Sequence, residues 1–199
     1  MTLPNGYTNI EPGRLAAIVT YLEMTADPGL DESVPPDGVE VRRIAEPDLD
    51  WYRALFREVG ERWLWFSRLT MSDDELRSII RDQGVDVHVL TVSGEDCGLM
   101  ELDFREPPDV ELKFLGVLPG ITGKGLGGLL LREGIRRAWR DNPRRFWLHT
   151  CTLDHPSALR FYIRHGFTPY ARGIEVSPDP RLTGALPRGA GPGIPLIEG

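Results

Sequence analysis

The sequence feature that most constrains the fold of this chain is a glycine-rich turn between a strand-like run and an amphipathic helix. Residues 110–117 read as a strand, and the turn after them carries Gly120, Gly123, Gly125, Gly127 and Gly128. Glycine allows positive φ and a close approach of the backbone to a ligand. The first N–H groups of the following helix have no partner within the helix and lie at the positive end of its dipole. The segment therefore predicts a phosphate or pyrophosphate site, and an ordinary tight turn with a helix cap is the alternative.

Two other glycine-loop classes fit less well. Residues 123–128 satisfy the G-x-G-x-x-G spacing of dinucleotide-binding proteins, but such a loop should directly follow the first strand of a βαβ unit. Here three hairpin-linked strand-like runs precede it. A Walker-type loop is excluded because Gly125, and not Ser or Thr, follows Lys124, and because Leu118 stands where its first glycine is required.

The composition limits the classes of protein to which this chain can belong. The 199 residues suit one domain with an appendage, and the net charge of −7 argues against nucleic acid as the main partner and suits a cationic or amine substrate. We find no membrane-length apolar run and no secretory signal, and therefore expect no membrane partner. Cys97 and Cys151 make no disulfide framework, so a cytoplasmic location is expected.

The chain divides into three segments by its pattern. Residues 1–37 read as an N-terminal extension, 38–172 as the globular domain, and 173–199 as a Pro/Gly-rich tail, which we expect to be peripheral from Ser177 onward. Within the extension, Leu15 to Met24 fits either a strand or a short buried helix, and periodicity does not decide between them.

The globular segment alternates strand and helix signals. We expect strands at 39–43, 85–92, 97–104, 110–117, 146–152 and 167–171, and helices that begin at Asp48 or Asp50, at Ser72 with Glu75 in a capping box, at Leu126, and at Asp154 as N-cap of a helix reaching Gly166. Short connections imply antiparallel neighbours. The predicted fold is α/β, with a mixed, mostly antiparallel central sheet flanked by helices.

Two motifs in this order of elements resemble the GNAT superfamily of acyl-CoA-dependent N-acyltransferases. The family's pyrophosphate loop, Arg/Gln-x-x-Gly-x-Gly/Ala, is matched by Thr-Gly-Lys-Gly-Leu-Gly at 122–127. Its second motif, Asn-x-x-Ala-x-x-Leu/Phe-Tyr-x-x-x-Gly-Phe, is matched by residues 155–167, His-Pro-Ser-Ala-Leu-Arg-Phe-Tyr-Ile-Arg-His-Gly-Phe. Thr122 replaces the usual Arg or Gln, where Lys124 could supply the phosphate contact, and His155 replaces the usual Asn. The resemblance covers 39–171.

The resemblance implies transfer of an acetyl or other acyl group from acetyl-CoA to a primary amine, by direct attack on the thioester and without a metal. It implies that the glycine loop holds the pyrophosphate, and that the pantetheine amides bond to a free strand edge at 115–117. The cofactor-binding residues so implied are Leu115, Val117, Thr122, Gly123, Lys124, Gly125, Gly127, Gly128, His155 and Tyr162.

The same resemblance suggests three catalytic groups. Tyr162 would protonate the leaving thiolate, and the N–H of Val117 would stabilise the oxyanion. Glu111 lies where related members carry a glutamate base, and strand parity would place it with Lys113, Leu115 and Val117 on one face. A core role for Tyr162, and for Glu111 a solvated carboxylate paired with Lys113, are the structural alternatives.

The acceptor side is less defined by the sequence. Glu101, His149 or a water molecule are rival bases, and Glu101 and His149 are also grouped with Trp63, Trp65 and Phe66 as the predicted acceptor pocket. The aromatic residues lie in the segment that caps this pocket in the family, although a packed helix pair would need them equally. Small-molecule and peptide amines both remain open as acceptors.

Two further hypotheses stand beside the enzyme. The chain could be a catalytically idle module that binds and senses acyl-CoA. The terminal segments could instead be interaction elements, for example strand exchange of Leu15 to Met24 in a homodimer. Cys151 is expected to be a buried strand residue, and no Cys/His spacing suggests a metal site.

Overall fold

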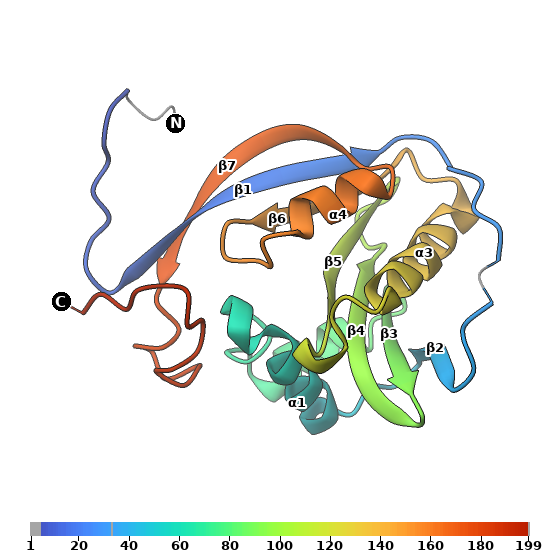
Figure 1. Ribbon diagram of the computed structural model, residues 1–199, viewed down its shortest axis with the longest axis horizontal. Coiled ribbons are helices and arrows are strands. Elements are labelled where there is room, and N and C mark those ends of the chain that lie inside the picture. Colours follow the sequence, from blue (N-terminus) through green and yellow to red (C-terminus); the bar gives the residue numbers. More distant parts are fainter. Residues whose placement is uncertain (1–4, 33, 199) are drawn as a thin grey trace.

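A seven-stranded sheet forms the centre of the molecule (Figure 1). The structure is a computed structural model that describes residues 5–32 and 34–198. The strand order is β2-β3-β4-β5-β6-β1-β7, and neighbouring strands are antiparallel except β5 and β6. The strands are β1 (Arg14–Met24), β2 (Val39–Ile44), β3 (Val85–Val92), β4 (Glu95–Asp103), β5 (Asp109–Val117), β6 (Arg145–Cys151) and β7 (Thr168–Pro178). The predicted mixed, mostly antiparallel sheet is confirmed.

Helices cover the two faces of the sheet. The α-helices are α1 (Leu49–Gly60), α2 (Asp73–Ile80), α3 (Leu126–Ala138) and α4 (Ala158–Arg164). The buried residues of α3 and Tyr162 of α4 pack on one face, and those of α1 and α2 pack on the other. Strand β4 serves both faces, because Leu99 packs with α1 and the next residue, Met100, packs with α3. This alternation is the period-2 pattern of a strand buried on both sides.

The apolar run near the N-terminus is a strand. β1 lies between β6 and β7 and is antiparallel to both, so residues before 38 supply an inner strand of the sheet. Leu22 and Met24 pack under the α3 and α4 face, while Leu15 faces the other side. In the protomer, β1 is thus paired on both edges within its own sheet. The strand-exchange hypothesis would need this pairing to be replaced by a second chain.

The C-terminal segment is more integrated than its composition indicated. β7 continues to Pro178, and Asp179 and Arg181 then form an ion pair whose side chains are each 2 % exposed. Arg181 also donates to the carbonyls of residues 190, 194 and 195. Leu186 and Ala190 are buried against Leu15 and Leu64. The prediction of a peripheral tail is therefore wrong for these residues. The buried guanidinium of Arg181 holds the Pro/Gly-rich segment in place by hydrogen bonds to its carbonyl groups.

Most local signals are confirmed at helix ends. Asp48 caps α1 by accepting from the N–H groups of residues 50 and 51, and Ser72 and Glu75 form the predicted capping box of α2. The exception is Asp154, which was predicted to cap the last helix. α4 begins later, with Ser157 at the N-cap position, and Asp154 makes other contacts described below.

A buried histidine lies under α3. His88 on β3 is 5 % exposed, and its Nδ1 has no hydrogen-bond partner in the described chain. Nearby, Asp86 pairs with Arg43 at 2.6 Å and with Arg137 at 2.5 Å. Burial lowers the pKa of His88 to about 4, since the attraction of Asp86 is opposed by the two arginines. His88 is therefore neutral in the folded protein at pH 7.

This histidine makes stability depend on pH. A folded-state pKa of about 4 lies below the unfolded value of about 6.5, so its contribution is complete above pH 6.5 and is lost as pH falls toward 4. We expect the free energy of unfolding of the wild type to fall by about 3 kcal/mol more than that of His88→Leu over this window. Urea unfolding at several pH values measures this. His149→Gln changes an exposed histidine and should keep the wild-type dependence of the unfolding free energy on pH. An equal pH dependence in His88→Leu and the wild type would contradict the prediction.

Candidate acyl-transfer site

The glycine loop leaves the N-terminus of α3 open. Gly123 and Gly125 have φ of +84° and +81°, in the left-handed region that favours glycine. Gly125 is the N-cap residue and has no side chain to accept from the first N–H groups of the helix. A Cβ added at Gly123, Gly125 or Gly127 would meet nothing within 4 Å, so the space above the loop is open. The N–H groups of Leu126 and Gly127 are thus available to an external anion, whereas that of Gly128 donates to the carbonyl of Gly125 at 3.0 Å.

The side chains of the loop leave its backbone exposed. Lys124 is exposed, and the exposed Thr122 donates its hydroxyl back to the carbonyl of Leu118 at 3.4 Å. Gly128 lies against the end of α4, because a Cβ there would be 3.3 Å from Nε2 of His165. The loop is therefore supported from α4 and open on its outer side.

Strands β5 and β6 diverge beside this loop. Their parallel pairing runs from Asp109 and Arg145 to Leu112 and Leu148, and stops there. Beyond it, Leu115 and Val117 pair only with β4, opposite Met100 and Gly98. The backbone edge of residues 115–117 that would face β6 consequently has no strand partner among the described residues.

A bulge in β5 changes which side chains share a face. The register with β4 shifts between Glu101 and Leu102, so that Lys113 is the extra residue. Leu112 packs in the same core as Leu115 and Val117, three and five residues on. The prediction that Glu111 shares a face with Leu115 and Val117 is therefore wrong, since one inserted residue reverses the alternation. Glu111 lies on the face of the sheet opposite α3.

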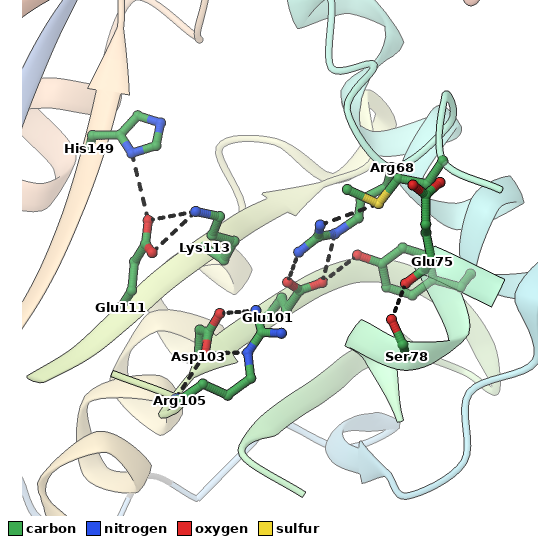
Figure 2. A network of polar contacts seen from close by, with 11 residues as sticks. Arg68, Glu75, Ser78, Glu101, Asp103, Arg105, Glu111, Lys113 and His149 are labelled. Atoms are coloured by element: carbon green, nitrogen blue, oxygen red, sulfur yellow. Dashed lines mark hydrogen bonds and ion pairs between the residues drawn. The ribbon is translucent and has the colours of Figure 1, made fainter. Parts of the chain in front are cut away.

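Glu111, Lys113 and His149 form a polar group on that face (Figure 2). Nζ of Lys113 donates to both carboxylate oxygens of Glu111 at 3.1 Å, and Nδ1 of His149 lies 3.8 Å from Oε1. The side chain of Glu111 is 13 % exposed and that of His149 is 38 % exposed. Two candidate bases, Glu111 of β5 and His149 of β6, are thus adjacent.

Glu101 lies in a separate, buried network (Figure 2). Its carboxylate is fully buried and is held by the guanidinium of Arg68, while the hydroxyl of Tyr52 donates to Oε2 at 2.6 Å. Burial and then the Glu101 carboxylate raise the pKa of Tyr52 well above its ordinary value. Because Glu101 is fully buried and its countercharge Arg68 is buried with it, the structure does not place Glu101 at an open acceptor surface.

The aromatic residues after α1 have different positions. The ring of Trp65 lies 5.3 Å from that of Phe114, and its indole N–H donates to Asp154 at 3.2 Å. Phe66 packs against the cluster of Leu15, Leu64, Leu186 and Ala190. Trp63 makes an edge contact with His155 at 5.1 Å. Of the three, Trp65 is the residue in contact with the strand that carries the free edge.

Asp154 links the loop after β6 to the segment after α1. Its Oδ2 accepts from the hydroxyl of Thr150 at 2.7 Å and from the N–H of Cys151 at 2.9 Å, while Oδ1 accepts from Trp65. Sequence reasoning missed this role, because an Asp two residues before a proline matches an N-cap signal equally well. Only its spatial neighbours distinguish the two roles.

Tyr162 and Cys151 remain protonated near neutral pH. Tyr162 is buried beside Phe161 and Phe167, and its hydroxyl has no hydrogen-bond partner among the described residues. Burial, followed by the Asp154 carboxylate, raises the pKa of Tyr162 well above its usual value. The same two causes raise the pKa of Cys151 to about 11, which does not suit a nucleophile.

His155 has a defined tautomer. Its Nδ1 accepts from the N–H of Ser157 at 3.1 Å and lies 2.7 Å from the hydroxyl of that residue. The neutral ring therefore carries its proton on Nε2. It can act as a donor where the family's asparagine amide would stand.

The fold and the motifs together define an acyltransferase, and the comparisons agree. Residues 48–167 match the acetyltransferase (GNAT) family. The chain belongs to the GNAT family of acetyltransferases. An uncharacterized N-acetyltransferase of Lactobacillus delbrueckii subsp. lactis is 26 % identical over 168 residues, which are 75 % of this chain and 95 % of the relative.

No helix within the described residues is long and apolar enough to cross a membrane.

Solved structures share the fold. A GCN5-related N-acetyltransferase from Kribbella flavida has a TM-score of 0.56 at 17 % identity, over 86 % of this chain and 63 % of that protein. Another from Sphaerobacter thermophilus has a TM-score of 0.59 at 18 % identity, over 84 % of this chain and 52 % of that protein. This chain therefore spans about half to two thirds of the length of these structures.

Proposed function

We propose that the protein transfers an acetyl group from acetyl-CoA to a primary amine of a small molecule or peptide. The observation that carries the proposal is the free edge of residues 115–117 beside the uncapped N-terminus of α3. The edge offers backbone groups to the amides of pantetheine, and the helix terminus offers N–H groups to a pyrophosphate. A thioester held there is the electrophile of the reaction.

The proposed roles follow from which face each group occupies. Tyr162 lies on the α3 and α4 face, where the cofactor would bind, and Glu111 lies on the opposite face, where an acceptor would approach. The amine nitrogen attacks the thioester carbonyl carbon, and the N–H of Val117 stabilises the oxyanion. When the C–S bond breaks, Tyr162 protonates the thiolate, and Glu111 takes the ammonium proton through water.

Calorimetric titration tests the cofactor class first. We expect acetyl-CoA and free CoA to bind with micromolar affinity and NAD not to bind. An amine panel followed by release of free thiol then tests transfer. Absence of CoA binding would overturn the proposal. CoA binding without turnover of any amine would favour the idle acyl-CoA-binding module.

The role of Glu111 is tested by Glu111→Gln, which keeps the shape of the side chain and removes its proton-accepting oxygen. We expect kcat/KM to fall by about 10²-fold and the acid limb of its pH profile to disappear. His149→Gln is the matched variant from the adjacent strand and should keep that limb. If His149→Gln abolishes the limb and Glu111→Gln does not, His149 is the base.

A further inference from the structure

Trp65 packs against the strand that carries the free edge. A Cβ added at Gly116 would be 2.4 Å from Cγ1 of Val59 and 3.2 Å from Cη2 of Trp65, and one added at Gly60 would be 2.5 Å from Cβ of Trp65. The absence of a side chain at Gly60 lets Trp65 approach the end of α1, and the absence of one at Gly116 lets both Val59 and the indole ring approach the backbone of β5. Gly116 lies between Leu115 and Val117, so Val59 and the ring of Trp65 cover one face of β5 at the residues that carry the free edge.

The orientation of the ring is fixed from two sides. Phe56 and Phe114 have ring centroids 5.5 Å and 5.3 Å from that of Trp65. The indole N–H donates to Asp154, which is held in turn by Thr150 and by the N–H of Cys151. Trp65 therefore reaches from β5 to the loop after β6, which are the two elements that diverge.

This position matters for the acyl group. The inference rests on the proposed function, which places the thioester carbonyl at the N–H of Val117. The α3 and α4 face holds Tyr162 and the core packed around it. An acyl chain must therefore extend through the gap toward the other face, where the ring of Trp65 and its bond to Asp154 close the space beside Gly116.

We propose that Trp65 limits the donor to acetyl-CoA. A methyl group ends before the ring, whereas each added methylene has to displace an indole that is packed and hydrogen-bonded. A hydrophobic pocket discriminates one methylene by roughly 10- to 200-fold. Trp65 is in this view a specificity-determining residue, and Asp154 is the residue that positions it.

The test measures donor binding, so it needs no known acceptor. The wild type is titrated with CoA, acetyl-CoA, butyryl-CoA and hexanoyl-CoA. We expect acetyl-CoA to bind about as tightly as CoA, and butyryl-CoA and hexanoyl-CoA at least about 10-fold more weakly. Trp65→Ala should bring the two longer donors to within a few-fold of acetyl-CoA.

Two further variants and a control complete the design. Trp65→Leu should also relax the limit if Trp65→Ala folds poorly, and Trp65→Phe should keep part of it, because a smaller ring remains without the bond to Asp154. Trp51→Ala is the matched control, since Trp51, near the start of α1, also donates its indole N–H to an aspartate, Asp96 of β4, at 2.7 Å. It should keep the wild-type ranking of donors.

The outcomes separate the two proposals. If CoA and acetyl-CoA bind but folded Trp65→Ala and Trp65→Leu keep the wild-type ranking, the role of Trp65 is overturned alone. Equal affinity of the wild type for acetyl-CoA and hexanoyl-CoA overturns it as well. If no CoA species binds, the acyl-transfer proposal falls and the role of Trp65 falls with it.

Discussion

Tyr162→Phe should lower kcat by about 10²-fold while leaving the affinity for CoA unchanged, because it removes a proton donor and keeps the ring. The phenol is buried and its raised pKa keeps it protonated near neutral pH, so a proton is available when the thiolate leaves. The Phe ring should retain the contacts of Tyr162 with Phe161 and Phe167. The measurement is thiol release at saturating acetyl-CoA, paired with calorimetric titration of CoA.

The control for this variant is Tyr170→Phe. Tyr170 is 43 % exposed on the edge strand β7, so loss of its hydroxyl should change neither kcat nor CoA affinity. An unchanged kcat in Tyr162→Phe would remove Tyr162 from the mechanism. A loss of CoA affinity with unchanged kcat would instead give its hydroxyl a binding role.

Arg68→Ala should destabilise the protein by about 3–5 kcal/mol, because it leaves the Glu101 carboxylate buried without its countercharge. The side chains of Arg68 and Glu101 are 5 % and 0 % exposed, so water cannot replace the guanidinium without opening the core. Tyr52 would remain as a donor to Glu101, but a neutral hydroxyl does not compensate a full charge. Urea unfolding at pH 7 measures the change.

The matched control is Arg77→Ala. Arg77 also pairs with a carboxylate, that of Asp74, but the two side chains are 44 % and 95 % exposed. Its removal should change stability by less than about 0.5 kcal/mol. The triple variant Arg68→Met, Glu101→Leu and Tyr52→Phe should recover most of the loss, since apolar residues can replace a buried pair and no Tyr52 hydroxyl is then left without its acceptor. A loss below about 1 kcal/mol in Arg68→Ala would contradict the prediction.

Local signals predicted much of the fold. The capping box at Ser72 and Glu75, the amphipathic helix from Leu126, and the hairpin between the strands expected at 85–92 and 97–104 are confirmed, because each depends on residues within a few positions of one another. The positive φ of Gly123 and Gly125 likewise follows from the glycines themselves. The two motifs that led to the family lie on these local elements.

Contacts between distant residues could not be predicted in this way. The bulge at Lys113 is a mismatch between two strands, and no pattern within β5 alone marks it. The pairing of Glu101 with Arg68 joins residues 33 positions apart. Asp154 carried a helix-cap signal that its contacts with Trp65 and Thr150 outweighed.

The sequence by itself determined the class of the protein, because the glycine loop, the helix after it and the Tyr162 motif are local patterns whose physics does not depend on the remainder of the chain. Only the tertiary structure decided that Arg14–Met24 is an inner strand, that Glu111 faces away from Val117 and beside His149, and that Trp65 lies on Gly116. The physical reason is the same for each. Strand pairing, register and packing depend on interactions between segments that lie far apart in the chain. The identity of an apolar or charged residue does not show which distant residue it will contact.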